Sequence, residues 1–259
     1  MSFEVSNEWW KDLFDEVYLL TDARSVCDEV LTQQEVNCLE KILNLKKSDA
    51  ILDLCGGQGR HAIELSRRGF TNITVLDYSH YLITLGQQQA RQAGFSTQFI
   101  QGDARDVGLR EASFQYIIVM ASSFGYFIDE GENLKILQEA YRLLQPKGTL
   151  LLDLINRDYM LKRFKPFSVH QVNEDITVQR ERVLGDDIIF SKETVISATK
   201  GHIRTKTYCT RLYSPQKIST LLFSAGFSSV ECISDFMDRD ANGDFGCLTN
   251  RMIILAKKP

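Results

Sequence analysis

The chain has 259 residues, of which 44% are hydrophobic and 25% are charged, and its formal net charge is -4 with a pI of about 5.7. This length and composition predict one large α/β domain, or a core that carries a small lid. The mild negative charge argues against nucleic acid or an anionic membrane surface as the partner, because such partners select basic faces.

The spacing of the cysteines and the N-terminal sequence indicate in which cellular compartment the protein is expected. Six cysteines stand at positions 27, 38, 55, 209, 232 and 247, and no two have C-x-x-C spacing, so we expect reduced thiols and no metal site. The N-terminus is acidic and aromatic, without a basic or apolar leader, and no apolar run approaches the roughly 20 residues that cross a bilayer. We therefore expect a cytoplasmic protein without a membrane anchor, either a monomer or a homodimer.

Residues 1–48 predict a helical cap, because apolar and aromatic side chains recur there at helical spacing in two successive series. One interpretation is a pair of amphipathic helices that pack on the core. The other is a cap over a ligand, with Trp10, Phe14 or Tyr18 reaching that ligand. Both interpretations stay open at this point.

Residues 49–60, DAILDLCGGQGR, are the segment around which the rest of the chain is organised. The apolar run Ala50–Leu54 predicts a buried strand whose end carries one carboxylate, Asp53. Three glycines follow, and a helical pattern extends from about 58 to 68, where Gly69 is placed for a left-handed cap. Glycines let the backbone approach a ligand closely, and a helix N-terminus favours an anionic group. The unit predicts a nucleotide-binding α/β fold.

Residues 49–155 continue as alternating strands and helices. Further strands are predicted at residues 73–77, 96–101, 116–120 and 149–155, with helices beginning near Ser79 and Glu132. The strand after the first helix ends in Asp77, and the next is followed by Asp103, so carboxylates stand at three successive strand ends. The alternation predicts a doubly wound parallel sheet with ligands at the carboxyl ends of its strands, where Asp77 suits the two hydroxyls of a ribose.

These stretches resemble the motifs of the class I S-adenosylmethionine (SAM) methyltransferases. The family's acidic-x-Gly-x-Gly-x-Gly pattern is similar to Asp53-x-Cys55-x-Gly57-x-Gly59, with Cys55 in place of the first glycine. Because cysteine is small, we expect the turn to survive. Gly102-Asp103-Ala104 is similar to the family's third motif, and LQPKGTL at 144–150 resembles its Leu-x-Pro-Gly-Gly turn, with Lys147 in place of a glycine.

The resemblance implies a doubly wound, Rossmann-like seven-stranded sheet with a terminal antiparallel hairpin. It also implies SAM as the cofactor and S-adenosylhomocysteine as its product. In the family the residue that corresponds to Asp103 meets the adenine amino group, while the charge of Asp53 suits the ammonium group of the methionine moiety. The predicted cofactor-binding residues are Tyr18, Asp53, Cys55, Gly56, Gly57, Gly59, His61, Asp77, Tyr78, Asp103, Ala104, Arg105, Met120 and Ser122.

Two other functions remain open from the sequence. Gly57-x-Gly59-x-x-Ala62 also fits the looser dinucleotide fingerprint, so an NAD(P)-linked oxidoreductase is one alternative. Asp53 favours SAM, because a carboxylate repels a pyrophosphate and attracts an ammonium group. A non-catalytic SAM-binding scaffold of the same fold is the second alternative, since binding motifs carry no information on turnover.

Residues 156–213 change character. Three segments rich in β-formers, with turns at Gly185-Asp186-Asp187 and Lys200-Gly201, predict an antiparallel insertion after strand five. We interpret this insertion as a substrate lid because it emerges from the carboxyl end of that strand, where the site is expected. The alternative is an edge sheet with solvated charges.

The core resumes over residues 214–259. Ser214-Pro215 predicts the start of a helix and Gly226 its end. Two strands are then predicted, at 230–234 and 249–256. They resemble the terminal hairpin of the family, whose last strand inserts antiparallel between its neighbours.

We expect methyl transfer to nitrogen or oxygen of a small molecule. Enzymes of the family that methylate DNA bases or glutamine carry an Asn/Asp-Pro-Pro-aromatic sequence after strand four. This chain has none there, and Ser122, Ser123, Phe124 and Tyr126 are candidates for the transfer pocket instead. An amine needs only delivery in its neutral form, whereas a hydroxyl or a carbon acid needs a base. The candidate catalytic residues are Tyr126, His170, His202 and Tyr208.

Overall fold

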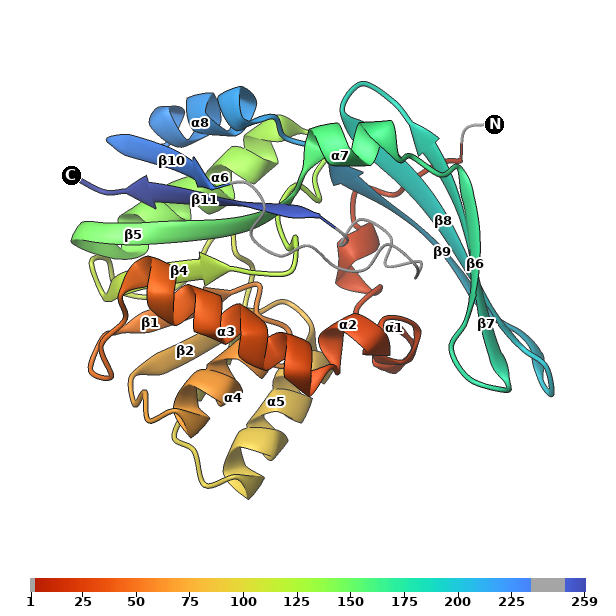
Figure 1. The fold of residues 1–259 in the computed structure, drawn as a ribbon, viewed down its shortest axis with the longest axis horizontal. Helices are drawn as coiled ribbons and strands as arrows, with labels where there is room; N and C mark the ends of the chain where they lie inside the picture. Colours follow the sequence, from red (N-terminus) through yellow and green to blue (C-terminus); the bar gives the residue numbers. More distant parts are fainter. Residues whose placement is uncertain (1–2, 234–249) are drawn as a thin grey trace.

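The computed structural model describes residues 3–233 and 250–259, which fold into two sheets (Figure 1). Within these residues the larger sheet has the strand order β10-β11-β5-β4-β1-β2-β3. Its strands are β1 (Ile51–Leu54), β2 (Ile73–Asp77), β3 (Gln98–Gln101), β4 (Phe114–Val119), β5 (Leu144–Ile155), β10 (Ser229–Ile233) and β11 (Arg251–Lys257). Because β11 lies antiparallel between β5 and β10 in an otherwise parallel sheet, the predicted fold class is confirmed.

Helices cover both faces of this sheet. The helices on one face are α3 (Glu29–Leu43), α4 (Arg60–Arg67) and α5 (His80–Gln92), and those on the other are α6 (Glu130–Leu143) and α8 (Pro215–Ser224). Side chains alternate along the buried strand β1, so that Ile51 packs toward α3 and α4 while Leu52 packs toward α6 and α8. The strand order reverses between β1 and β4, which is where doubly wound sheets bind ligands.

Local signals set several boundaries. Ser79 and Ser214 accept hydrogen bonds from amides of the first turns of α5 and α8, as predicted for N-caps. The turn predicted at 145–148 is instead part of β5, although Lys147 has a φ of 65°, the conformation of the glycine that it replaces. The predicted strand ends at Ser234 and Thr249 lie outside the described residues, as does Cys247.

The N-terminal segment does not contain the helix that the spacing of residues 9–18 predicts. A 3-10 turn, η1 (Trp9–Lys11), is followed by the short helices α1 (Glu16–Thr21) and α2 (Ala23–Val26). The carboxylate of Asp15 accepts a hydrogen bond from the amide of Tyr18 and begins a new helix there. Trp9 and Leu13 are buried against the second sheet, so tertiary packing replaces the helical face that the pattern suggested.

The insertion after β5 forms four strands, one more than predicted, and it begins with a helix, α7 (Arg157–Lys162). Its strands are β6 (Phe167–Gln171), β7 (Ile176–Leu184), β8 (Ile188–Ser197) and β9 (Gly201–Arg211), in that order across the sheet. The sequence did not reveal β6 because this edge strand buries neither of its faces.

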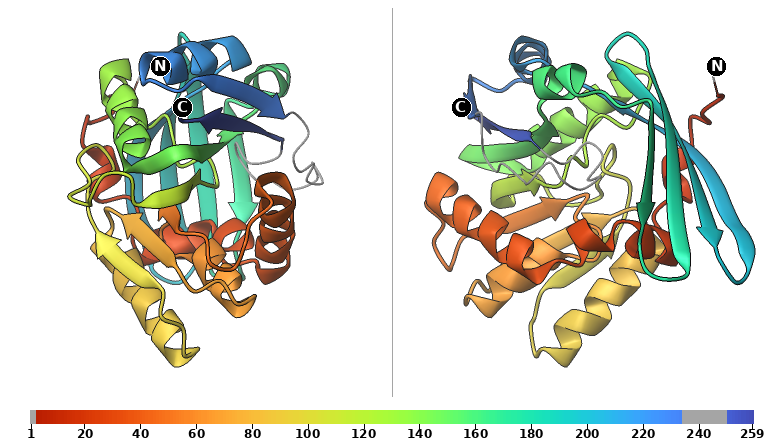
Figure 2. Two further views of the ribbon diagram at one scale, coloured as in Figure 1. Left: turned by 90° about the vertical axis from the view of Figure 1, so that its left-hand side faces the viewer. Right: turned by 45° about the vertical axis from the view of Figure 1, so that its right-hand side comes forward.

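The antiparallel sheet stands across the carboxyl ends of the larger sheet, and η1, α1 and α2 lie between the two (Figures 1 and 2). Among the described residues no helix is both long and apolar enough to cross a membrane.

Candidate functional site

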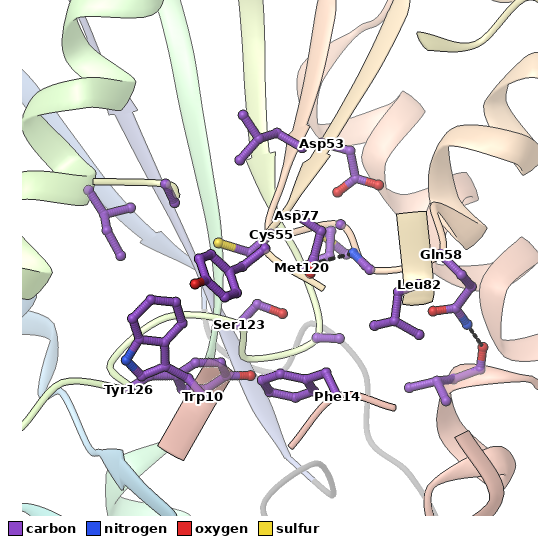
Figure 3. Close-up of a pocket in the computed structure, with 18 of the residues that line it drawn as sticks. Trp10, Phe14, Asp53, Cys55, Gln58, Asp77, Leu82, Met120, Ser123 and Tyr126 are labelled. Carbon is purple, nitrogen blue, oxygen red and sulfur yellow. Dashed lines mark hydrogen bonds between the residues drawn. The ribbon is translucent and has the colours of Figure 1, made fainter. Parts of the chain in front are cut away.

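A cavity of about 960 Å³, which we call the strand-end cavity, opens at the carboxyl ends of β1, β2 and β4. This volume includes the solvent space at its open mouth. Loops of the sheet form one side, and aromatic rings of the N-terminal segment together with Tyr126 form the other (Figure 3). The predicted residues on its wall are Trp10, Phe14, Tyr18, Asp53, Cys55, Gly56, Gly57, His61, Asp77, Tyr78, Asp103, Ala104, Met120, Ser123 and Tyr126.

Asp53 is fully buried at the end of β1 and lines this cavity. Neither of its carboxylate oxygens has a hydrogen-bond partner among the described residues. Burial raises the pKa of Asp53 to about 7. The charge of Arg60 opposes this rise, and the charge of Asp77 reinforces it. A buried carboxylate in this state is costly until a cation or a donor meets it. The position suits a positively charged group of a ligand.

The turn after β1 is shaped around Asp53. A Cβ atom added to Gly56 would lie 2.7 Å from Cγ of Asp53, so only glycine lets the loop close over the carboxylate. Cys55 and Gly57 both have a φ of 59°, in the left-handed region that glycine occupies without strain. Cys55 therefore keeps the turn of the family pattern, as expected, at a cost of about 1 kcal/mol.

Asp77 is fixed at the end of β2 by two backbone amides. Its Oδ2 accepts a hydrogen bond from Gly57 at 2.8 Å, and its Oδ1 accepts one from Ser79 at 2.8 Å. Burial raises the pKa of Asp77, while these amide hydrogen bonds oppose the rise. Each oxygen keeps a second lone pair, so the carboxylate can still accept hydrogen bonds from a ligand in the cavity.

Two residues predicted to bind the cofactor, Gly59 and Arg105, lie behind the wall. A Cβ atom on Gly59 would lie 2.7 Å from the ring of Phe99, so this glycine serves close packing. Nη2 of Arg105 lies 2.6 Å from Oδ2 of Asp103, and its guanidinium packs over the ring of Trp10. Burial opposes ionisation of Asp103, but the hydrogen bonds from Arg105 lower its pKa. Arg105 thus connects Asp103 to the N-terminal segment.

A buried ionic network lies behind the cavity. Glu35 of α3 contacts Arg60, Arg251 and Nε2 of His61, and Nε of Arg251 lies 3.0 Å from Oδ1 of Asp153. Burial and the charge of Arg60 lower the pKa of His61 to about 4, so its ring is neutral at pH 7. Burial opposes ionisation of Glu35, but its three partners hold its pKa far below the usual range. Sequence reasoning missed this network because Glu35 and Arg251 are 216 residues apart.

The network ends at the loop after β4. Ala121 and Ser122 have φ values of 57° and 59°. The amide of Ala121 donates a hydrogen bond to Oδ2 of Asp153, and the amide of Ser122 donates one to the carbonyl oxygen of Asp153. Ser123 lines the strand-end cavity, whereas Ser122 faces a second cavity, where its buried hydroxyl has no hydrogen-bond partner among the described residues. Phe124, a candidate for the transfer pocket, is buried in the core instead.

The second cavity, of about 910 Å³, adjoins the first, and we call it the sheet-side cavity. It lies between the N-terminal segment, the loop after β4 and the antiparallel sheet. The residues that line both cavities are Phe14, Tyr18, Val26, Ala121 and Tyr126. The charged residues on its wall are Asp22, Arg180, Arg182, Glu193 and Arg204.

Four of these residues form one set of ion pairs, namely Asp22, Arg180, Glu193 and Arg204. Nη2 of Arg180 lies 2.9 Å from Oε2 of Glu193 and 3.1 Å from Oδ2 of Asp22. Arg204 contacts Oε1 of Glu193 at 3.2 Å and Oδ1 of Asp15 at 2.6 Å. The sequence held one signal for this wall, because Arg180 and Arg182 continue the buried alternation of β7. Sequence reasoning did not use that signal.

The structure separates the four catalytic candidates. Tyr126 lines both cavities and Tyr208 lines the sheet-side cavity. Burial raises the pKa of both phenols well above the usual range, so they are protonated at neutral pH. His170 contacts the carbonyl oxygen of Thr21 at 3.2 Å, and His202 is exposed beside the β8–β9 turn. Neither histidine lines either cavity.

Comparison with known proteins agrees with this site. The model of a family described as "Methyltransferase domain" matches residues 51–148. YqeM of Bacillus subtilis (strain 168), which carries a methyltransferase name without an assigned acceptor, is 22% identical over 90% of this chain and 95% of its own. The glycine/sarcosine N-methyltransferase of Halorhodospira halochloris is 29% identical over 79% of this chain and 76% of its own.

Among solved structures, an S-adenosylmethionine-dependent methyltransferase from Clostridium acetobutylicum ATCC 824 superposes with a TM-score of 0.69. It is 17% identical to this chain, and the match covers 98% of this chain and 93% of that one. At that identity the likeness shows the fold.

The strand order and the glycine turn with its strand-end carboxylates define the class I methyltransferase fold. Together with the match of residues 51–148 to the methyltransferase-domain model and with the relatives, they support a class I SAM-dependent methyltransferase. Its cofactor is SAM, and S-adenosylhomocysteine is the product.

Proposed function

We propose that this methyltransferase transfers a methyl group to nitrogen or oxygen of a small molecule that binds in the sheet-side cavity. The observation that carries the proposal is the adjacency of the two cavities, which share walls at Tyr18, Ala121 and Tyr126. Ligands in the two cavities meet at these residues. The second cavity is lined by aromatic and charged side chains, which suit a polar small molecule.

In this proposal the strand-end cavity binds SAM. Asp53, buried with no hydrogen-bond partner among the described residues, suits the ammonium group, and Asp77 suits the ribose hydroxyls. Asp103 and its neighbour Ala104 both line the cavity, and we propose that Asp103 meets the adenine. SAM supplies a methyl group that is already activated on a sulfonium. The protein contributes alignment of the reacting groups and exclusion of water.

The acceptor side of the proposal comprises the N-terminal segment and the insertion at 156–213. Asp12 and Asp15 of that segment contact Lys206 and Arg204 of β9, and Trp9 donates a hydrogen bond to the carbonyl oxygen of Tyr126. These contacts join the segment to β9 of the antiparallel sheet and to the loop after β4. We propose that the insertion serves as wall and lid for the acceptor.

The relatives support a small acceptor. The protein from Halorhodospira halochloris is named for methylation of nitrogen in glycine and sarcosine. The name of YqeM leaves its acceptor open. The names of the relatives therefore support a small acceptor and do not identify it.

A labelled-methyl assay tests the proposal. The protein is incubated with SAM carrying tritium in its methyl group and with a cell extract separated into metabolites, proteins and nucleic acids. We expect the label in the metabolite fraction. Label confined to proteins or nucleic acids would contradict the proposal.

Two variants and a control test which ligand each cavity binds. Tyr208→Leu should slow methyl transfer several-fold and leave the Kd for SAM within about twofold, because Tyr208 lines only the sheet-side cavity. Asp77→Ala should weaken SAM binding itself. Tyr81→Leu, at a residue 41% exposed on α5, is the matched control and should change neither quantity.

A further inference from the structure

We propose that the reacting group of the acceptor is an amine, held at the junction of the two cavities by an aromatic wall and the carboxylate of Asp22. The inference rests on the proposed function and narrows its acceptor from nitrogen or oxygen to nitrogen. The rings of this junction wall are Trp9, Phe14, Tyr18, Tyr126 and Tyr208.

The rings of the junction wall form one continuous surface. The ring centroids of Trp9 and Tyr126 are 5.1 Å apart, and those of Phe14 and Tyr126 are 5.8 Å apart with nearly parallel planes. Phe14 also contacts Tyr18 at 5.0 Å, and Trp9 contacts Tyr208 at 5.8 Å. The faces of such rings attract cations and hold methylated ammonium groups in particular.

The electrostatics of the junction are also suited to an amine. Asp22 ends α1 on the same segment that carries Phe14 and Tyr18, and it lines the sheet-side cavity. Burial raises the pKa of the phenols of Tyr18, Tyr126 and Tyr208, and the negative charge of Asp22 adds to the rise at each. The negative charge of Asp22 therefore acts on the aromatic wall, where it would also attract a cation.

The other charges lie on the antiparallel sheet. Arg180 bridges Asp22 and Glu193, while Arg204 contacts Glu193 from β9. These arginines, with Arg182, present donors to the polar remainder of an acceptor. The acceptor is thereby oriented with its amine toward the N-terminal segment and the cofactor.

The side chains of the sheet-side cavity offer little basic catalysis. All four histidines of the chain lie within the described residues, and none lines this cavity. Its tyrosines are protonated at neutral pH, and its two carboxylates are engaged by Arg180.

An alcohol acceptor needs a base at this point, whereas an amine does not. The ammonium form that the rings and Asp22 bind would first lose a proton to water. The lone pair of the neutral nitrogen would then form the new N–C bond while the C–S bond of the sulfonium breaks and its electron pair stays on sulfur. The proton of the resulting ammonium then passes to water.

Binding of a matched pair of probes tests the inference without turnover. Choline and its neutral isostere 3,3-dimethylbutan-1-ol are titrated into the protein saturated with S-adenosylhomocysteine, and tryptophan fluorescence and calorimetry report binding. We expect choline to bind about tenfold more tightly or better, which corresponds to about 1.4 kcal/mol. Equal affinities, or failure of both probes to bind, would overturn the inference.

Variants locate the selectivity in the junction wall. Phe14→Leu keeps an apolar side chain and removes a ring, so the preference for choline should fall to about threefold or less. Asp22→Asn should weaken choline and leave the neutral isostere unchanged. Phe167→Leu, 54% exposed on β6, is the matched control and should keep the full preference. Retention of the preference in both junction variants would contradict the placement.

The outcome separates the two proposals. Failure of SAM and S-adenosylhomocysteine to bind would remove the proposed function together with this inference. Binding of both nucleosides, without any preference for choline, would leave the proposed function intact and overturn the amine acceptor alone.

Discussion

The two adjoining cavities differ in whether their carboxylates are paired with basic side chains of the protein. In the strand-end cavity Asp53 is buried with no hydrogen-bond partner among the described residues, and Asp77 is held only by backbone amides. In the sheet-side cavity Arg180 contacts both Glu193 and Asp22, and Arg204 contacts Glu193, so both carboxylates are paired within the protein. The first cavity leaves charges for its ligand to complete. The second pairs its carboxylates with arginines and adds an aromatic surface, beside which we propose that Asp22 meets an amine.

The two cavities also differ in how they are built. The strand-end cavity is formed largely by loops that follow successive strands of one sheet, each with a short local motif. The sheet-side cavity brings together the N-terminal segment, the loop after β4 and strands β7 to β9. Local turns therefore fix the cofactor side, while contacts between distant segments fix the acceptor side.

The largest expected effect comes from breaking the ionic network behind the strand-end cavity. Arg251→Met leaves Glu35 and Asp153 buried without the cation between them, and it should lower the free energy of unfolding by about 3 to 5 kcal/mol. Urea titration measures the loss. The matched control Lys192→Met, from an exposed pair with Glu181, should lose less than about 1 kcal/mol. Equal losses would show that the network contributes nothing beyond a surface pair.

Removing a carboxylate of the strand-end cavity should weaken SAM binding without affecting the sheet-side cavity. Asp77→Ala should raise the Kd for SAM about 30-fold, or about 2 kcal/mol, because hydrogen bonds to a charged group are lost. The choline preference of the other cavity should stay unchanged. Asp158→Ala, at a residue whose side chain is 72% exposed, is the control. An unchanged Kd in Asp77→Ala would contradict the assignment of this residue.

The unpaired state of Asp53 predicts how SAM binding depends on pH. Its pKa in the ligand-free protein is raised to about 7, so the carboxyl takes up a proton as the pH falls through this value. The protonated form no longer attracts an ammonium group, and the affinity should fall by up to about tenfold per pH unit below 7. Calorimetry between about pH 5.5 and 7.5 measures this slope. Asp53→Asn should bind weakly with a flat profile, and a flat profile in the native protein would contradict the role of Asp53.

The same shift affects stability. Because the pKa of Asp53 is raised on folding, its ionisation destabilises the ligand-free protein, and the cost grows as the pH rises from the unfolded value through about 7. Asp53→Asn should therefore stabilise the ligand-free protein at pH 8 by about 1 kcal/mol or more. Thermal unfolding with and without SAM measures this, and SAM should reverse the order of the two proteins.

The smallest expected effect concerns the backbone of the glycine turn. Cys55→Gly relieves a left-handed residue, with a φ of 59°, and raises the entropy of the unfolded chain. The net gain should be about 0.5 kcal/mol, seen as a slightly higher Tm. A loss of more than about 1 kcal/mol would mean that packing of the thiol outweighs the strain.

Local chemistry explains which parts of the site the sequence predicted. Asp53 and Asp77 end buried strands, and the glycines beside them are required by close approach, so short segments carry the signal. Glu35 and Arg251 meet across 216 residues, and their pairing leaves no local pattern. The alternation of strands and helices was predicted because each element has its own periodicity, whereas the terminal antiparallel hairpin followed from the resemblance to the family. The edge strand β6 buries neither face, and the spacing of residues 9–18 was overridden by packing between the sheets.

The central claim is that SAM binds in the strand-end cavity, where the carboxylate of Asp53 has no hydrogen-bond partner among the described residues. Calorimetric titration with SAM, S-adenosylhomocysteine and NADH in parallel tests it most directly. We predict micromolar binding of SAM and S-adenosylhomocysteine, loss of that affinity in Asp53→Asn, and no heat with NADH. Binding of NADH alone, or SAM binding that Asp53→Asn leaves unchanged, would contradict the account.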